Sequence, residues 1–342
     1  MELQNEQTEE VKHLLKNAKR IFITSHANPD GDALGSSLAL YHCFRKLGKE
    51  VMVASPNEWG DYLNWLPGCT EIRNYEKQKA EVVDFLKETE VIFCLDFNNL
   101  SRINEIGHHV RISKAKKILI DHHLEPQHFE DYAFWDPKAS STAELVYEFI
   151  TAIEGPEAID VTPGTCIYTG IMTDTGSFKF PTTTAKVHHI IARLIDLGVN
   201  NSEIHQRIYD TYSLNRLRLL GTALKDRMVV LPEYRTAYIT IDQMDYETYD
   251  LKTGDTEGLV NFPLMLQDVV FSVLLKDKGD IIKMSFRSKG DFPADEIARK
   301  YFGGGGHRNA AGGRLHETLD KTVDKLVSLL PQYKTRLLQE VL

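Results

Sequence analysis

Three short apolar runs in the first half of the chain are each followed at once by histidine or aspartate, and this pattern constrains the fold most. They occupy residues 20–25, 91–95 and 118–120. Runs this short, rich in leucine and β-branched residues, are typical of central strands in a parallel sheet, whose two faces are both covered. Ligand sites of open α/β sheets lie at the carboxyl ends of such strands. The pattern therefore predicts a metal or phosphate site there.

The runs alternate with segments of helical periodicity. Apolar residues recur at helical spacing in residues 9–19 and 33–47, a further strand is expected at 50–54, and helices are expected at 81–87 and from about residue 141. Strands that alternate with helices are the signature of a doubly wound parallel sheet. We therefore predict an α/β fold with this sheet in the N-terminal domain.

The second half of the chain has a different character. Residues 184–212 are helical in pattern and suit a connector. Four strand-like runs and a helix follow, at residues 228–231, 236–241, 269–275, 281–287 and 294–301, and the tail from residue 320 is helical with a break at Pro331. We predict a parallel-sheet domain at 1–190, a helical linker at 191–220 and a smaller mixed-sheet α/β domain at 221–342.

Composition limits the partners. With 342 residues the chain can form two cores, and its net charge of −9 argues against a protein that binds duplex nucleic acid. A small phosphorylated substrate is still compatible, because bound divalent metals reverse the local charge. The four cysteines are scattered, which favours reduced thiols. No signal core and no apolar stretch of about 18 residues is present, so we expect a cytoplasmic protein without a membrane span.

Acidic and histidine side chains gather where the runs end. They are His26, Asp30, Asp32, Asp96, Asp121, His122 and His123, and a later apolar run, residues 166–172, leads into Asp174. Neighbouring strand ends lie about 5 Å apart, so these groups can converge. Burying unpaired carboxylates is costly, so either cations neutralise them or they are spread apart in solvent. For Asp32 alone, a turn or helix cap is an equally good interpretation.

An oxygen-rich site with imidazoles suits Mn²⁺ or Mg²⁺ better than Zn²⁺ or copper. This many ligands favours two metals over one, and paired metals clamp the attacking and leaving oxygens of phosphoryl transfer. The residues alone therefore indicate a metal-dependent phosphohydrolase. The pairs His108-His109 and His188-His189 have no acidic strand-end neighbour, so we assign them to surface or core roles.

A glycine run near the C-terminus is a second candidate site. Four glycines, residues 303–306, precede His307 and Arg308, without the Lys-Ser/Thr of a P-loop or the context of a dinucleotide fingerprint. Glycines let backbone N–H groups approach an anion, and a helix start at residues 309–311 would add its positive end. The alternative is a flexible turn between domains.

Taken in order, these motifs resemble the DHH phosphoesterases that carry a DHH-associated C-terminal domain. The motifs are His26-x-x-x-Asp30-x-Asp32, Asp96, Asp121-His122-His123, Asp174 and the segment Gly-Gly-Gly-Gly-His-Arg-x-Ala-Ala-Gly. The resemblance extends over residues 15–330 and is greatest to the NrnA-type oligoribonucleases and 3′-phosphoadenosine-5′-phosphate (pAp) phosphatases.

The resemblance implies a role for each metal-site residue. It implies one Mn²⁺ on His26, Asp30 and Asp96, and a second on Asp32, Asp96, His122 and Asp174, with a hydroxide between them attacking phosphorus. Asp121 would orient a ligand, and His123 would face the phosphate as stabiliser or proton donor.

Substrate contacts are implied as well. The expected substrate-binding residues are Arg102, Arg287, Ser288, Gly303, Gly304, Gly305, Gly306, His307 and Arg308. Where the family often has a second acidic or small polar residue after the bridging aspartate, this chain has Phe97-Asn98-Asn99, which bears on substrate preference.

The resemblance implies degradation of short single-stranded oligoribonucleotides and dephosphorylation of pAp to AMP. The alternatives are cleavage of pApA or cyclic di-AMP, an inorganic pyrophosphatase or exopolyphosphatase, and a nucleotide-binding protein without activity. The glycine segment speaks against the pyrophosphatases, whose C-terminal lobe is built differently. Whether the protein is a homodimer stays open at this point.

Overall fold

The computed structural model describes residues 6–252 and 254–340 and divides into two compact units, one up to Thr211 and one from Tyr212. Helices α7 (Ala185–Asp196) and α8 (Asn201–Tyr209) bury apolar side chains in the core of the first unit. Helix α9 (Leu214–Thr222) belongs to the second. The domain limits at residues 190 and 220 stay a prediction, and the division at Thr211 falls between them.

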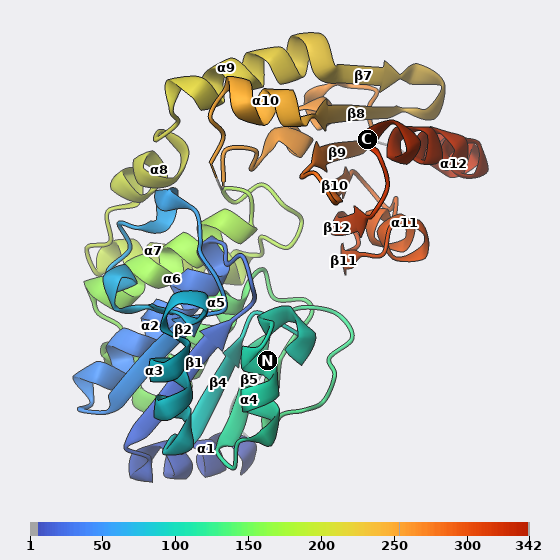
Figure 1. Ribbon diagram of the computed structural model, residues 1–342. Helices are drawn as coiled ribbons and strands as arrows, with labels where there is room; N and C mark the ends of the chain where they lie inside the picture. Colours follow the sequence, from blue (N-terminus) through green and yellow to red (C-terminus); the bar gives the residue numbers. More distant parts are fainter. Residues whose placement is uncertain (1–5, 253, 341–342) are drawn as a thin grey trace. The chain divides into compact units, whose positions relative to one another are not determined.

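The first unit is built on a six-stranded parallel sheet with the order β3-β2-β1-β4-β5-β6 (Figure 1). The strands are β1 (Arg20–Ser25), β2 (Glu50–Ser55), β3 (Arg73–Asn74), β4 (Val91–Leu95), β5 (Lys116–Asp121) and β6 (Tyr132–Trp135). The winding direction reverses between β1 and β4, the point at which ligands bind in such sheets. The predicted doubly wound α/β fold is confirmed. The sequence analysis missed the edge strands β3, which consists of two polar residues, and β6, which is only four residues long.

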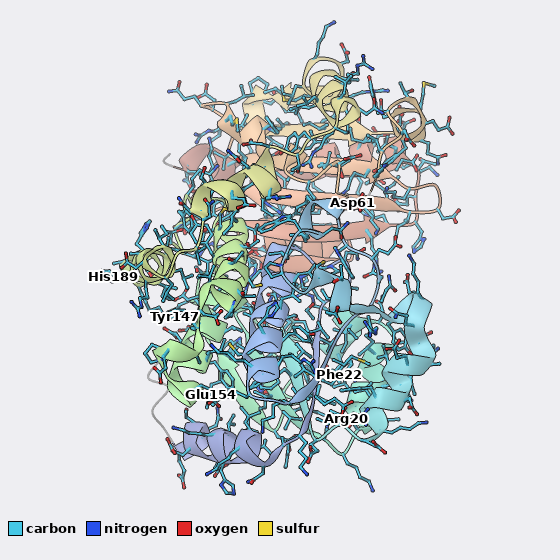
Figure 2. The ribbon with its side chains drawn as sticks, turned by 90° about the vertical axis from the view of Figure 1, so that its left-hand side faces the viewer. Arg20, Phe22, Asp61, Tyr147, Glu154 and His189 are labelled. Carbon is cyan, nitrogen blue, oxygen red and sulfur yellow. The ribbon has the colours of Figure 1, made fainter. Side chains whose placement is uncertain are left out.

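Helices cover both faces of this sheet. They are α1 (Glu6–Asn17), α2 (Gly31–Lys46), α3 (Tyr75–Lys87), α4 (Ile106–Ile112), α5 (Thr142–Glu154) and α6 (Val161–Asp174). Helices α1, α2, α5 and α6 share one core with the sheet, and α3 and α4 share the core on the other face. Phe22 of β1, labelled in Figure 2, belongs to the second of these cores.

The run at residues 166–172, grouped above with the strand ends, is helical and forms the second half of α6. Apolar runs of this length can be strand or buried helix, and periodicity alone does not separate them. Helix α6 packs very closely on α2 and α5 through glycines. A Cβ at Gly35 would lie 2.5 Å from the carbonyl oxygen of Cys166, and one at Gly170 would lie 2.5 Å from the Ala143 Cβ.

The second unit contains a mixed sheet with the order β11-β12-β10-β9-β8-β7, antiparallel except for the pair β8–β9. Its strands are β7 (Met228–Leu231), β8 (Thr236–Ile241), β9 (Phe271–Asp277), β10 (Ile282–Ser288), β11 (Gly305–His307) and β12 (Ala310–Leu315), and its further helices are α10 (Gln243–Thr248), α11 (Ala294–Tyr301) and α12 (Leu319–Gln339). Helices α11 and α12 cover one face, and α9 covers part of the other. The predicted smaller mixed-sheet unit is confirmed.

Two local predictions for this unit are wrong. Residues 309–311, expected to start a helix, are the turn and first residues of a hairpin between β11 and β12. Helix α12 continues through Pro331 without the expected break. Its buried stripe, including Leu326, Leu330 and Leu337, anchors it on the sheet on both sides of the proline, and this packing outweighs the one lost backbone hydrogen bond.

Within the described residues, no helix is long and apolar enough to cross a membrane. The four cysteines are buried as free thiols.

Replacing Gly170 with alanine tests the close packing of α6. The new Cβ would press on Ala143 and lie 2.9 Å from the Asp32 Oδ1 atom, so we expect a loss of about 1–3 kcal/mol in unfolding free energy, measured by urea denaturation. Gly221→Ala is the matched control, because a Cβ on Gly221 meets nothing within 4 Å. Equal stability of the two variants would contradict the packing account.

Candidate metal centre

Three strand ends at the switch point bring the first candidate ligands together. Ser25 of β1 pairs with Leu95 of β4, and Leu95 pairs with Ile120 of β5. The residues that follow these strands, His26 and Asp96 among them, therefore leave the sheet side by side. His26 Nε2 lies 3.4 Å from Asp96 Oδ2, and both side chains are buried.

The start of helix α2 supplies the next two carboxylates. Asp30 is the N-cap, and its Oδ1 atom accepts hydrogen bonds from the backbone N–H groups of Asp32 and Ala33 at 3.0 and 3.1 Å. Its other oxygen lies 3.8 Å from His26 Nε2. Asp32, one residue into the helix, is almost completely buried. The cap interpretation considered for Asp32 applies to Asp30 instead.

The N-terminus of helix α5 holds two of the buried carboxylates. The backbone N–H groups of Thr142 and Ala143 donate to the Asp32 carboxylate at 2.7 and 2.8 Å. The Thr142 hydroxyl donates to Asp96 Oδ1 at 3.0 Å. Ser141 caps the helix by accepting from the N–H of Glu144. Because a helix N-terminus carries partial positive charge, α5 stabilises negative charge where the strands alone would not.

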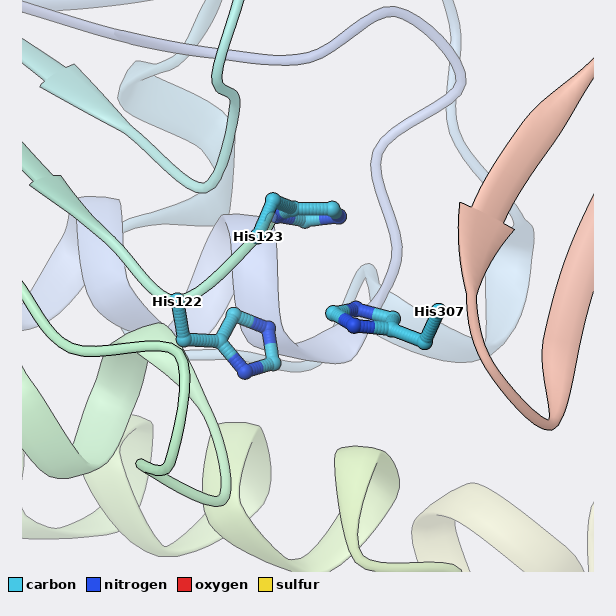
Figure 3. Close-up of side chains that lie close together, drawn as sticks. All are labelled: His122, His123 and His307. Atoms are coloured by element: carbon cyan, nitrogen blue, oxygen red, sulfur yellow. The ribbon is translucent and has the colours of Figure 1, made fainter. Parts of the chain in front are cut away.

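His122 and Asp174 close the cluster. His122 Nε2 lies 3.9 Å from Asp32, 3.6 Å from Asp96 and 3.4 Å from Asp174. Asp174 is the last residue of α6, and the carbonyl end of a helix favours a cation. Figure 3 shows the His122 and His123 rings next to each other after β5.

Hydrogen bonds fix which nitrogen of each histidine faces the carboxylates. Nδ1 of His26 contacts the Ala27 carbonyl oxygen at 3.0 Å, and Nδ1 of His122 contacts that of Ala139 at 3.2 Å. A carbonyl only accepts, so Nδ1 carries the proton in both rings. Each neutral ring then directs an Nε2 lone pair at carboxylate oxygens, an arrangement that requires a proton or a cation between them.

The pKa shifts within the cluster also indicate that a proton or a cation is needed there. Burial raises the pKa of Asp32 well above its usual value, and the charges of Asp96 and Asp174 raise it further. Burial acts to raise the pKa of Asp96 too, but the His122 and His26 rings outweigh it and hold this pKa well below its usual value. For His122, burial acts to lower the pKa, but Asp96 and Asp174 hold it well above the usual value. Excess negative charge is thus concentrated in a dry site.

Asp121 and His123 form a separate pair beside the cluster. The Asp121 carboxyl is fully buried, and its Oδ1 atom accepts from the backbone N–H of His123 at 3.2 Å and from its Nδ1 at 2.8 Å. This leaves Nε2 as the basic nitrogen of the ring. Arg102, in the short helix Leu100–Ile103, is half-buried and close enough to His26 for its charge to act on that ring.

In the second unit, Gly305 and Gly306 belong to strand β11, and Gly303 and Gly304 form the short connection that leads into it. A Cβ at Gly304 would lie 1.9 Å from the Gly312 carbonyl oxygen, and one at Gly306 would lie 2.5 Å from that of Ala310. Gly303 and Gly306 have positive φ values of 56° and 150°. These three glycines are therefore explained by the backbone path and by close contact between strands.

The other candidates of this unit lie on or beside the same strands. Arg287 is on β10, in the row that continues through Ala310 to His307. The exposed Arg308 guanidinium donates to the carbonyl oxygen of Asp291 at 2.8 and 3.1 Å. Ser288 differs, because its buried hydroxyl donates to the Phe292 carbonyl oxygen at 2.6 Å and so holds the local backbone.

Family models match both units. The DHH family, N-terminal domain, matches residues 20–171, and the DHHA1 domain matches residues 237–334. A bifunctional oligoribonuclease and PAP phosphatase NrnA from Thermus thermophilus is 31% identical over 92% of this chain and 90% of its own length. The chain belongs to the DHH phosphoesterase family. The resemblance stated from the motifs is confirmed.

Further relatives agree with this assignment. The NrnA protein of Bacillus subtilis is 29% identical over 92% of this chain and 96% of its own length. Among solved structures, an exopolyphosphatase-related protein from Bacteroides fragilis is 39% identical and superposes with a TM-score of 0.94, covering 97% of this chain and 98% of that one.

DHH phosphoesterases are metal-dependent, and the donors of this chain fit divalent cations. His26, Asp30 and Asp96 place one ligand atom each within 4.8 Å of one another, and so do Asp32, His122 and Asp174. Imidazole nitrogens and carboxylate oxygens in this ratio suit Mn²⁺ or Mg²⁺. The pKa shifts described above, which result from carboxylates gathered in a largely buried site, fit a site that binds cations.

Sequence reasoning missed Thr142 as a partner of Asp32 and Asp96, and the Ala139 carbonyl as the partner of His122. The cap motif before α5 predicted the helix start, but not that its N–H groups face distant carboxylates. The two histidine pairs that we assigned to surface or core roles lie outside the cluster. His189 points away from α7 into solvent (Figure 2), and His109 contacts the Tyr75 hydroxyl.

Asp121→Asn tests the pairing with His123. The neutral amide would no longer hold the Nδ1–H tautomer of His123 through its charge. We therefore expect phosphoesterase kcat to fall by about 10²-fold or more, which is within the range that a positioned acid or base contributes. Metal content, measured by elemental analysis, should stay at the wild-type value. Loss of bound metal together with activity would show that Asp121 supports the ligands instead of His123.

Proposed function

We propose that the protein is a metal-dependent phosphoesterase that releases mononucleotides from short oligoribonucleotides and converts pAp to AMP. The observation that carries this proposal is the convergence of His26, Asp96, His122 and the carboxylates of α2 and α6 at one point of the sheet. The similarity to NrnA proteins over about nine-tenths of the chain supports the substrate class.

The ligand sets proposed for the two cations follow the two clusters. His26, Asp30 and Asp96 would hold one. Asp32, His122 and Asp174 would hold the other, and Asp96 reaches both because its two oxygens face different histidines. When bound, such cations supply a nucleophile at neutral pH and stabilise negative charge on the phosphoryl oxygens.

The residues around the cluster would then orient and protonate the substrate. His123, held by Asp121 through Nδ1, would in its imidazolium form use the Nε2–H group to donate a proton to the leaving oxygen or to bind the phosphoryl group. The Arg102 guanidinium would bind a phosphate group bidentately, through two N–H···O hydrogen bonds. Helix α5 would keep Asp32 and Asp96 ionised and in place during the reaction.

Substrate binding is assigned to the second unit. Arg287, His307 and Arg308 are the candidate contacts for the rest of the nucleotide, with Gly305 as a point of close approach. The net charge of −9 supports a short single strand rather than a duplex as substrate.

Hydrolysis of inorganic polyphosphate is the second candidate. The exopolyphosphatase-related protein from Bacteroides fragilis is the observation that favours it, through its close match in fold and its 39% identity. A relative described as the cyclic-di-AMP phosphodiesterase GdpP of Bacillus subtilis is only 24% identical, and this chain covers 49% of it.

A side-by-side assay with Mn²⁺ tests the proposal. The substrates are pAp, a 5′-phosphorylated RNA dinucleotide, pApA, pyrophosphate and polyphosphate. We expect AMP from pAp and mononucleotides from the dinucleotides. Asp96→Ala should lower these rates by more than the roughly 100-fold loss seen when an outer-shell contact is removed, because Asp96 faces both ligand sets.

The exposed Asp84, which pairs only with Lys87, provides the control variant Asp84→Ala, which should keep wild-type rates. Turnover of polyphosphate without any nucleotide release would replace the proposed substrate class. Full activity of Asp96→Ala would overturn the proposed metal centre.

A further inference from the structure

A row of cations crosses three strands of the second unit. Lys283 on β10 is in direct register with Lys276 on β9 and with Arg314 on β12. Side chains in register are about 4.5–5.5 Å apart at Cβ, and like charges placed opposite each other destabilise a sheet. Across residues 6–252 and 254–340, none of the three forms an ion pair. Ion pairing within the described residues therefore does not account for this row.

The pKa of Lys276 is lowered by burial and in part by this repulsion. Its ammonium is mostly buried and donates to the Thr256 hydroxyl at 3.2 Å. Burial lowers the pKa of Lys276, the Glu257 carboxylate acts against this, and the charges of Lys283 and Arg287 lower the pKa further. An anion placed on the exposed Lys283 and Arg314 would relieve the repulsion.

The cationic row lies on the same sheet face as Arg287. Residues 283, 285 and 287 alternate with buried residues of β10 that pack on α11 and α12, so their side chains share the opposite face. Arg287 is in register with Ala310, which pairs with His307. Arg287 lies four positions after Lys283 on β10, a distance of about 13 Å along the strand.

The strip between the two rows carries almost no side chains. It consists of Gly305, Gly312 and Ser285, which are in register across β11, β12 and β10. Neither glycine has a positive φ, and a Cβ would meet nothing within 4 Å at Gly305 and only the Met284 carbonyl oxygen, at 3.7 Å, at Gly312. The fold therefore tolerates side chains at these positions. Their absence leaves the strand backbone accessible from this face, as is found where a ligand approaches a strand.

The spacing of the cations distinguishes between polyanions. A phosphodiester strand carries one charge per nucleotide, with an uncharged sugar between phosphates. Polyphosphate carries charge at every phosphorus and would place anions over the uncharged strip. At about 13 Å apart, the two cationic positions match phosphates of an extended single strand that are not neighbours in the chain.

We propose that Lys276, Lys283 and Arg314 bind a backbone phosphate of a single-stranded oligonucleotide beyond the nucleotides held near Arg287 and His307. This face would then make longer oligonucleotides bind more tightly than dinucleotides. The proposal rests on the proposed function for its substrate class.

The test uses Lys283→Ala/Arg314→Ala and a series of RNA oligonucleotides from two to five residues, with Mn²⁺. For the pentanucleotide we expect KM to rise by about tenfold with kcat unchanged, and the slope of log KM against log salt to fall by about 0.7, because one single-strand phosphate contact contributes about 0.7. Kinetics on pAp and the dinucleotide should not change. The control Lys12→Ala/Lys321→Ala removes two exposed cations elsewhere and should match the wild type throughout.

Equal effects on the dinucleotide and the pentanucleotide would overturn the inference, and so would a defect confined to polyphosphate. A binding measurement distinguishes failure of this inference from failure of the proposed function. If no nucleotide is released from any substrate, anisotropy with a fluorescent pentanucleotide is measured on Asp96→Ala with and without the double substitution. At least tenfold weaker binding with the double substitution supports this face as a strand site, and equal affinity excludes it.

Discussion

The hydrogen bonds from the N-terminus of α5 to Asp32 and Asp96 are the constraint on which the first unit depends. Two backbone N–H groups and the Thr142 hydroxyl hold carboxylates that come from two other elements, α2 and the end of β4. The cluster could not stay buried without these donors, because an unpaired carboxylate costs several kcal/mol to desolvate. The close packing at Gly35 and Gly170 follows, since α2, α5 and α6 must all reach one point. A proton or a cation between the rings and the carboxylates completes the arrangement, because the histidine lone pairs face the same oxygens.

The two units divide the chemistry. The parallel sheet of the first positions side chains at strand ends, where the strand order reverses, so ligands that are far apart in sequence meet without long loops. In the second, on the sheet face that α9 covers only in part, the register of β10, β11 and β12 places cations in two rows separated by glycines. A compact metal cluster suits the reacting phosphoryl group, and an extended face suits the rest of a strand. Each unit thus uses the feature that its sheet type provides.

Much of this was predictable from sequence, and the failures have physical causes. The strands ending at His26, Asp96 and Asp121 were predictable because buried parallel strands are continuous apolar runs. The helix ending at Asp174 was not, since seven apolar residues fit a strand or a buried helix equally well. The contacts of Thr142 and the hairpin of Gly305 were not predictable either, because both depend on partners distant in the chain. The candidate ligands could be proposed from residue types and order alone, whereas the charge balance around them needed coordinates.

Anomalous diffraction from crystals grown with Mn²⁺ tests the central claim most directly, because it locates the metal without reference to activity. We expect two anomalous peaks in the first unit. One should lie among His26, Asp30 and Asp96, and the other among Asp32, His122 and Asp174, with the α5 hydrogen bonds to Asp32 retained. A single peak, or peaks bound away from these residues, would contradict the account.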